Sequence, residues 1–252
     1  MEQQSNNIAI IFAGGVGQRL NGKDATPKQF LKINSKPIII HTLELFEKNP
    51  KISKIYIAIH PKYYNYMKEL VKYHYITKTA GIVKGGTTGQ DSIFNALNLA
   101  MKENAPDSLV LIHDGVRPNI TQEVIDKNIE NALKHGSSIT CTPCFETILI
   151  SKDGLEPSNV PYRKETFAAQ APQTFRLGEI FDAHIRERKE NPKYTDIIDS
   201  CTLFKKQGRK TSMVRGNCGN IKITTIEDLY ILRALIRFKE DMEAFGFAKQ
   251  ES

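Results

Sequence analysis

The chain has 252 residues, 40% of them hydrophobic, and a formal net charge of +7, which suffices for one large domain with a full core. It contains no apolar stretch long enough to cross a bilayer and no run of five basic residues, so we expect neither a membrane protein nor a nucleic-acid-binding track. Four cysteines in a chain this long form no disulfide framework, and no secretory signal precedes the first apolar run, which predicts the reducing cytoplasm.

Apolar strands alternate with amphipathic helices, as is typical of a mostly parallel sheet covered on both faces. The expected strands are Ile8–Ala13, Lys54–His60, Ala80–Val83, Ser108–His113 and Thr211–Arg215. The expected helices are Lys36–Glu47 with Ser35 as cap, Pro61 to about His74, about Gly89 to Met101, Thr121–His135, and a closing helix from Thr225, where Thr225 and Asp228 resemble a capping box. We expect a single α/β domain over residues 7–244, with frayed ends at 1–6 and 245–252.

The alternation breaks at about residues 137–160. Two β-runs, Ile139–Thr142 and Thr147–Ile150, flank a turn at Lys152-Asp153-Gly154, which predicts a hairpin that projects from the body. After Phe167 the pattern predicts further helices before the last strand.

The first expected strand opens into a glycine-rich turn, Gly14-Gly15-Val16-Gly17-Gln18-Arg19, and Pro27-Lys28-Gln29-Phe30 follows closely. Glycines allow backbone N–H groups to converge on anionic oxygens, and the two cations add full charge. The sequence therefore predicts a phosphate-binding loop.

Two common phosphate motifs do not match this loop. A dinucleotide fingerprint needs a third glycine where the chain has Leu20. The fingerprint also needs an acidic residue for the ribose, and the chain has no clear candidate. A P-loop needs Ser or Thr where the chain has Asp24, and Pro27 interrupts the helix that should follow.

Functional groups are expected where loops leave the carboxyl ends of parallel strands, here also at residues 85–92, 113–118 and 220–224. Asp114 closes an apolar strand, where a carboxylate can reach Mg²⁺ held by phosphate oxygens, although an aspartate there can also cap the next helix. Arg117 and Lys222 also have ordinary explanations. Arg117 can form a surface ion pair without a functional role, and Lys222 can be a solvated lysine on a strand.

The chain carries six motifs in this order: G-G-x-G-x-R, P-K-Q-F, G-G-x(4)-D-S, H-D-x-x-R-P, A-P-Q and N-I-K-I-T. Together they resemble the cytidylyltransferases that activate polyol phosphates, over residues 7–240. The resemblance implies a single-domain, Rossmann-like nucleotidyltransferase fold. It also implies a projecting β-arm that makes a homodimer, CTP and a polyol phosphate as substrates, and a divalent cation such as Mg²⁺.

The resemblance further implies a role for individual residues. It makes catalytic cations of Arg19, Lys28 and Lys222. It assigns nucleotide binding to Ala13, Gly14, Gly15, Gly17, Gly86, Thr87, Ser92 and Asp114, with Asp114 also on the metal side. It assigns acceptor binding to Arg117, Glu146, Thr147 and Arg163, partly across the dimer interface.

Three departures from the isoprenoid-type members bear on the acceptor. Gly219 stands where they usually carry an acid, Glu146-Thr147 replaces Asp-Thr on the arm, and Ala171-Pro172-Gln173 replaces Thr-Pro-Gln. Ribitol-type members also lack the acid and share Phe30 in P-K-Q-F. These features favour D-ribitol 5-phosphate, giving CDP-ribitol for wall or capsule polymers. The alternative acceptor is 2-C-methyl-D-erythritol 4-phosphate of isoprenoid synthesis.

The sequence also allows two functions from other classes of protein. A nicotinamide-dependent dehydrogenase would need the missing third glycine and ribose acid. A non-catalytic basic adaptor would use the net positive charge to bind polyanions, with an affinity that falls steeply with salt.

Overall fold

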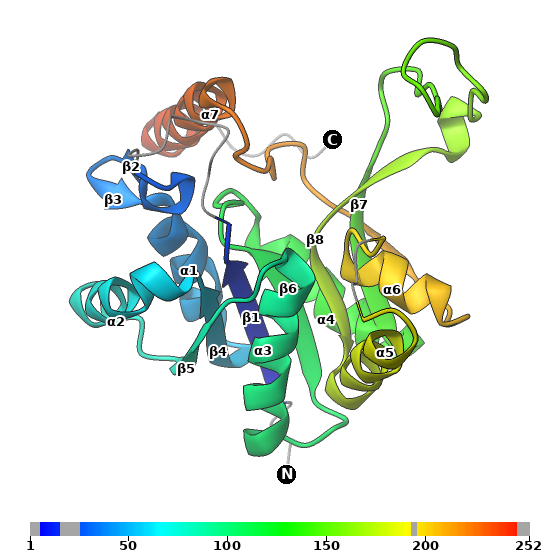
Figure 1. Cartoon of the computed structure of the whole chain (residues 1–252). Coiled ribbons are helices and arrows are strands. Elements are labelled where there is room, and N and C mark those ends of the chain that lie inside the picture. Colours follow the sequence, from blue (N-terminus) through cyan, green and yellow to red (C-terminus); the bar gives the residue numbers. More distant parts are fainter. Residues whose placement is uncertain (1–5, 16–25, 193–195, 246–252) are drawn as a thin grey trace.

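The computed structural model describes residues 6–15, 26–192 and 196–245, and its centre is a seven-stranded sheet with helices on both faces (Figure 1). The strands are β1 (Asn7–Ala13), β4 (Ile52–Ile59), β5 (Thr79–Lys84), β6 (Leu109–Asp114), β7 (Ser137–Pro143), β8 (Phe167–Arg176) and β9 (Met213–Arg215). The helices are α1 (Ile38–Lys48), α2 (Tyr64–Tyr73), α3 (Gly89–Glu103), α4 (Gln122–His135), α5 (Leu177–Glu190), α6 (Ser200–Lys206) and α7 (Ile226–Ala244). Of the predicted frayed ends, 1–6 and 245–252, all but residues 6 and 245 lie outside the described residues.

The sheet confirms the predicted mostly parallel α/β architecture. Its order is β5-β4-β1-β6-β8-β7-β9, and within it β8 is antiparallel to both of its neighbours. Because β1, β4, β5 and β6 are parallel, their carboxyl ends open onto one edge of the sheet.

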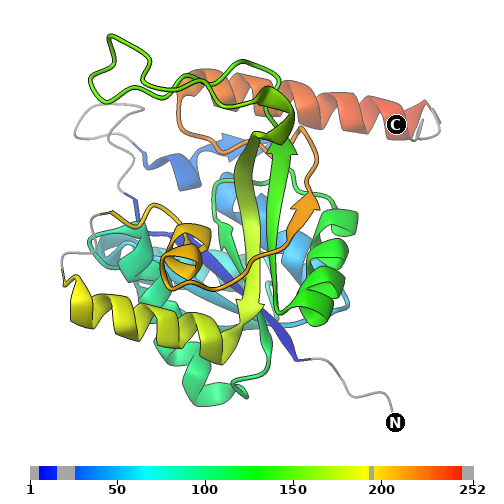
Figure 2. The same cartoon turned by 90° about the vertical axis from the view of Figure 1, so that its right-hand side faces the viewer.

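Two hydrophobic cores form because successive side chains of a strand point to opposite faces. In β1, Ala9 and Ile11 pack in the core that α1, α2 and α4 cover, whereas Ile8 and Ile10 pack in the core of α3, α5 and α6. All four residues are fully buried, which explains why β1 reads as a continuous apolar run. Figure 2 shows α4 and α5 on opposite faces of the sheet.

A third, smaller core attaches α7 to the body. Ile223, Leu229 and Leu232 pack there with Ile33 and Ile38. The predicted capping box is confirmed, since the Thr225 side chain accepts from the Asp228 N–H and the Asp228 carboxylate accepts from the Thr225 N–H. This packing fixes the loop before α7, which carries Lys222.

The predicted cap at Ser35 is wrong. Asn34 and Ser35 have φ values of 49° and 65° and form the turn of a two-residue hairpin between β2 (Lys32–Ile33) and β3 (Lys36–Pro37). Two consecutive positive φ values suit such hairpin turns, and α1 therefore begins later, after Pro37.

The helices predicted after Phe167 are confirmed as α5 and α6, but the prediction missed strand β8 (Phe167–Arg176), which precedes them. Its three alanines and Pro172 have low β-propensity, so its strand character comes from its neighbours, β6 and β7. The β7–β8 register shifts between Ile139 and Cys141, and sheets tolerate proline at such irregularities.

The predicted projecting hairpin is correct in place but not in detail. Residues 137–143 belong to the sheet as β7, and residues 144–166, here called the arm, project from the ends of β7 and β8 (Figure 1). The expected strand Thr147–Ile150 is wrong, since these residues form only an isolated bridge, between Ile150 and Asn159. Asp153 makes the predicted turn by accepting hydrogen bonds from the backbone of Leu155 and Glu156.

None of the helices in the described part of the chain is long and apolar enough to cross a membrane.

Candidate active site

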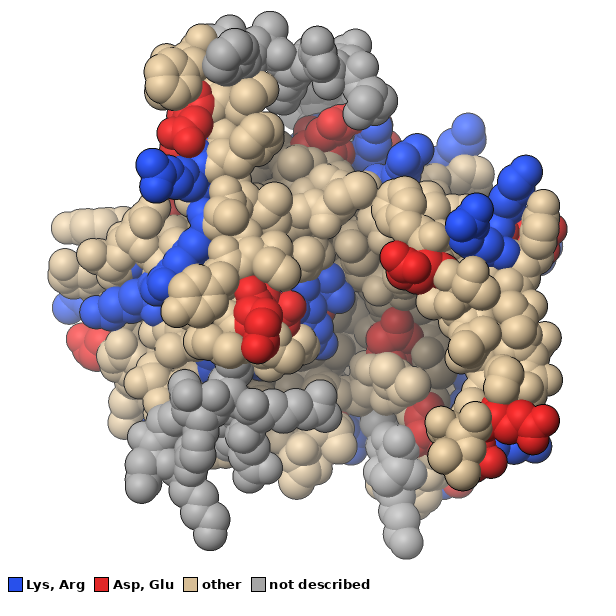
Figure 3. Space-filling model, turned by 90° about the horizontal axis from the view of Figure 1, so that it is seen from above, with Lys and Arg blue, Asp and Glu red and all other residues tan. Residues whose placement is uncertain are grey.

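The carboxyl ends of β1 and β6 face a cavity of about 270 Å³, which also borders α3, β8, α6 and the loop before α7. Figure 3 looks onto this end of the molecule, where basic and acidic side chains lie interspersed around a central hollow. The cavity is lined by Phe12, Gly89, Gln90, Ile93, Ile112, Asp114, Arg117, Ala169, Gln170, Ala171, Gln173, Ile198, Asp199, Ser200 and Lys222.

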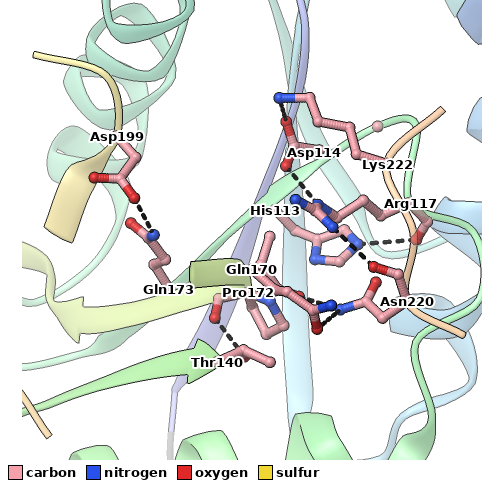
Figure 4. A network of polar contacts seen from close by, with 12 residues as sticks. His113, Asp114, Arg117, Thr140, Gln170, Pro172, Gln173, Asp199, Asn220 and Lys222 are labelled. Atoms are coloured by element: carbon pink, nitrogen blue, oxygen red, sulfur yellow. Dashed lines mark hydrogen bonds and ion pairs between the residues drawn. The ribbon is translucent and has the colours of Figure 1, made fainter. Parts of the chain in front are cut away.

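A carboxylate between two cations lies in this cavity (Figure 4). Asp114 Oδ1 is 2.8 Å from Lys222 Nζ, and Asp114 Oδ2 is 2.9 Å from Arg117 Nε. The side chains of Asp114 and Arg117 are 11% and 12% exposed, whereas that of Lys222 is 43% exposed. The ordinary alternatives for two of these residues do not apply, because the cap of α4 is Thr121 and the Asp114–Arg117 pair is largely shielded from solvent. Lys222 lies in a loop rather than on a strand and is partly exposed.

The cations determine the charge of Asp114. Burial alone would raise the pKa of its carboxyl, but the charges and hydrogen bonds of Lys222 and Arg117 outweigh burial and hold the pKa below its ordinary value. Asp114 is therefore ionised at neutral pH.

Arg117 is held rigidly by the surrounding backbone. Its Nη1 donates to the carbonyl of Asn220 at 2.8 Å, and its own carbonyl lies 3.1 Å from Nε2 of His113. Burial lowers the pKa of His113 to about 4, so the ring is neutral and serves as a fixed hydrogen-bonding group. Asn220 in turn donates from Nδ2 to the carbonyl of Ala171 at 2.7 Å, which ties the loop before α7 to β8.

The two glycine-rich loops meet at Ser92. A Cβ on Gly14 would lie 2.4 Å from Ser92 Oγ, and one on Gly86 would lie 2.2 Å from the Cβ of Asp91, so side chains are excluded at both positions. Ser92 Oγ accepts from the N–H of Gly86 at 3.1 Å. The structure thus brings the predicted nucleotide-binding residues Gly14, Gly86 and Ser92 together.

Thr87, also predicted to bind nucleotide, is used within its own loop. Its hydroxyl donates to Asp91 Oδ2 at 2.6 Å, and Asp91 forms an ion pair with Arg188 of α5. Arg188 also stacks on Phe94, with its guanidinium carbon 4.1 Å from the ring centroid. Arg188 therefore links α5 to the start of α3 and stabilises the loop that precedes it.

The sequence argument missed the role of Gln29. Its side-chain amide is buried and donates to the carbonyls of Ala13 and Gly15, at 3.2 and 3.1 Å. These bonds connect P-K-Q-F to the start of the predicted phosphate-binding loop, and Lys28 begins the short helical turn Lys28–Phe30. The only signal in the sequence was a polar residue, Gln29, within P-K-Q-F. The spacing of the motif does not show which groups that side chain contacts.

We expect Gln29→Met to raise severalfold the KM for the nucleotide that this loop is predicted to bind, and to lower the free energy of unfolding by about 1–3 kcal/mol. The reason is that methionine fills the same space but leaves two carbonyls of the phosphate loop without their donor. Steady-state kinetics and thermal unfolding measure the two effects. Unchanged values of both would show that the loop does not depend on Gln29.

Other predicted site residues lie elsewhere. Gly17 and Arg19 fall outside the described residues. Glu146, Thr147 and Arg163 are exposed on the arm and do not line the cavity of their own chain. The structure brings together Asp114, Arg117 and Lys222, and it leaves the arm residues free to meet another surface.

The donor set suits a cation that is held mainly by substrate. No cluster of three or more His, Cys, Asp or Glu side chains that could hold a metal occurs within residues 6–15, 26–192 and 196–245. Asp114 offers one buried carboxylate, and each of its oxygens retains acceptor capacity beyond its cation. Mg²⁺ commonly binds one or two carboxylates together with substrate phosphates and water, so Asp114 fits such an ion.

A larger hollow of about 420 Å³ lies between α2 and β5, but its lining argues against catalysis. Lys68 and Lys72 border it with tyrosine and aliphatic side chains, and no carboxylate faces them. The chemically equipped cavity is therefore the smaller one.

An α/β sheet with glycine loops at its strand ends and cations converging on a cavity defines a nucleotide-dependent transferase. The chain belongs to the 2-C-methyl-D-erythritol 4-phosphate cytidylyltransferase (IspD) family, whose profile matches residues 7–238.

Similar curated proteins carry two different acceptor names. The chain is 42% identical to the ribitol-5-phosphate cytidylyltransferase of Vibrio parahaemolyticus, with 95% of this chain and 100% of that protein covered. It is 41% identical to the protein of that name from Streptococcus agalactiae serotype Ia, covering 95% and 99%. It is 32% identical to the 2-C-methyl-D-erythritol 4-phosphate cytidylyltransferase of Alkaliphilus oremlandii, covering 96% and 99%.

Solved structures agree on the fold. The 4-diphosphocytidyl-2C-methyl-D-erythritol synthase of Anaerococcus prevotii superposes with a TM-score of 0.77 at 28% identity, covering 93% of this chain and 97% of that one. The 2-C-methyl-D-erythritol 4-phosphate cytidylyltransferase of Francisella tularensis superposes with a TM-score of 0.75 at 30% identity, covering 90% and 97%.

Proposed function

We propose that the protein transfers CMP from CTP to D-ribitol 5-phosphate, forming CDP-ribitol and pyrophosphate. The observation that carries this proposal is the Asp114–Arg117–Lys222 cluster at the cavity of a cytidylyltransferase-family chain. The acceptor is supported by the higher identity to ribitol-5-phosphate enzymes than to the Alkaliphilus enzyme, at similar coverage.

The reaction needs no nucleophilic side chain. The acceptor's phosphate is mostly dianionic at neutral pH, because its second pKa is about 6. One of its oxygens forms a bond to the α-phosphorus of CTP, and the bond from that phosphorus to the oxygen bridging to the β-phosphorus breaks. The electron pair leaves with pyrophosphate.

The main obstacle is repulsion between the dianion and the triphosphate. Lys222 is exposed enough to turn from Asp114 to a phosphate, while Arg117 stays fixed by Asn220. Lys28 and Arg19, from the first loop, would bind the triphosphate. Such preorganised cations stabilise the charge that develops in the transition state.

Asp114 would contribute to holding Mg²⁺ together with the phosphates of CTP. When bound, the ion supplies further neutralisation of the triphosphate.

We also propose that the protein is a homodimer joined through the arm. Large apolar side chains of the arm are exposed, including Phe145 (70%), Leu155 (90%) and Tyr162 (62%). Exposed apolar surface of this extent is typical of an interaction site. A second copy would cover it and would bring Glu146, Thr147 and Arg163 to the acceptor phosphate in the neighbouring cavity.

The acceptor assignment predicts a clear preference in a panel of polyol phosphates. With CTP and Mg²⁺, we expect kcat/KM for pyrophosphate release to be at least tenfold higher with D-ribitol 5-phosphate than with 2-C-methyl-D-erythritol 4-phosphate. A preference for the methylerythritol compound would overturn the assignment of the acceptor but not that of the reaction type. Reduction of a nicotinamide cofactor instead of pyrophosphate release would overturn both.

A composite site predicts complementation between two weakened variants. Arg163→Ala and Lys222→Ala should each be nearly inactive alone, because one damages the arm and the other the cavity. Mixed dimers place both defects in one site and leave the other intact, so co-expression should restore roughly a quarter of wild-type activity. No recovery from purified mixed dimers would contradict a site shared between subunits.

A further inference from the structure

One wall of the active-site cavity has unused hydrogen-bonding capacity. Gln90, in the first turn of α3, and Ser200, the first residue of α6, both line the cavity. They are 4% and 2% exposed, yet Gln90 Oε1 and Ser200 Oγ have no hydrogen-bond partner within the part of the chain that the structure describes. Buried polar atoms are seldom left unpaired, which makes these two conspicuous.

The residues beside them are fully engaged. Gln173 Nε2 donates to Asp199 Oδ2 at 2.7 Å, and Gln173 Oε1 accepts from the N–H of Cys201 at 2.9 Å. Asp199 Oδ1 accepts from the N–H and the hydroxyl of Thr202, at 2.8 and 2.7 Å. The start of α6 is therefore fixed, and Ser200 is held at the cavity rather than fraying away from it.

The position of this wall favours the acceptor over the nucleotide. The glycine loops at Gly14 and Gly86 do not line the cavity, whereas Asp114, Arg117 and Lys222 do. The cavity thus extends from these three residues toward α6. On the α3 side its lining is Gly89 and Gln90 rather than Gly86, Thr87 or Ser92, the residues predicted to bind the nucleotide. Its other lining includes Phe12, Ile93 and Ile112, which suit a carbon chain.

We propose that Gln90 and Ser200 determine acceptor specificity by hydrogen-bonding the free hydroxyl groups of the polyol. A hydroxyl can donate to Gln90 Oε1, and Ser200 Oγ can donate to or accept from another. This inference rests on the proposed function, since it takes the acceptor to be a polyol phosphate. A site built to pair hydroxyls discriminates strongly against analogues that lack them.

The test is a pair of variants, Gln90→Met and Ser200→Ala, assayed with D-ribitol 5-phosphate and with the shorter D-erythritol 4-phosphate. We expect each variant to raise the KM for D-ribitol 5-phosphate about tenfold, with the KM for CTP unchanged. Selectivity for the longer polyol over the shorter should fall by a similar factor. The melting temperature should not fall, because neither substitution removes a hydrogen bond present in the free protein.

Gln173→Met is the matched control, since it removes two hydrogen bonds and should lower the melting temperature. A KM for the polyol within twofold of wild type in both variants would overturn the inference, and so would a rise in the KM for CTP alone. If the wild type prefers another polyol phosphate, the acceptor proposed above fails. The same variants assayed with the preferred compound still decide the role of Gln90 and Ser200.

Discussion

Lys222→Ala is expected to lower kcat/KM by about 10²–10³-fold, which is typical of losing one preorganised charge at a transition state. Lys222 Nζ lies 2.8 Å from Asp114 in the cavity, and its partial exposure leaves it able to reach a phosphate. The fold should survive, because Ile221 and Ile223 pack in the core that anchors α7 while the lysine side chain does not.

The measurement is steady-state pyrophosphate release with CTP and the polyol phosphate, beside thermal unfolding. Lys102→Ala is the matched control, since Lys102 is an exposed lysine near the end of α3, remote from the cavity. A Lys222→Ala rate within tenfold of wild type would remove this lysine from the catalytic account.

Asp114→Asn is expected to lower kcat by about 10²-fold and to destabilise the protein by about 3 kcal/mol. Asparagine keeps the shape of the side chain but removes the charge between Lys222 and Arg117. Arg117, whose side chain is only 12% exposed, then lacks a counter-ion, and Lys222 loses the partner that orients it. The substitution also removes the carboxylate that would help to hold Mg²⁺.

The stability effect should have a defined pH dependence. Because the folded-state pKa of Asp114 is depressed, its contribution is fully present above the unfolded-state value, near 3.9, and is lost as the pH falls through the lower folded-state value. The difference in unfolding free energy between wild type and Asp114→Asn should therefore be constant from pH 7 to 5 and shrink below about pH 4. A difference that vanished already between pH 7 and 6 would mean that another group controls the pair.

Much of the fold could be predicted because most strands are continuous apolar runs and most helices have clear ends. Gly136, for example, ends α4 with a φ of 84°, as a glycine after a helical pattern suggests. β8 could not be predicted, since its strand character comes from the pairing of residues 167–169 and 173–176 with β6 and β7, while Ala171 and Pro172 lie in the irregular stretch between them. Local propensity does not contain that information.

The site could be predicted in part for a similar reason. The rule that loops at the carboxyl ends of parallel strands carry function selected Asp114, Arg117 and Lys222, which the structure brings together. Gln29 was missed because it acts through the main-chain carbonyls of Ala13 and Gly15, and such contacts depend on the final geometry. The arm could be recognised as an insertion, but its partner cannot be read from its own residues.

The most direct test of the proposed reaction follows the α-phosphorus of CTP. With CTP labelled at that phosphorus and D-ribitol 5-phosphate, we predict that the label appears in CDP-ribitol, identified by mass spectrometry, in amounts equal to the pyrophosphate released. Lys222→Ala should reduce both products together. Label recovered only as CMP, or pyrophosphate released without a labelled CDP-polyol, would contradict transfer to the polyol phosphate.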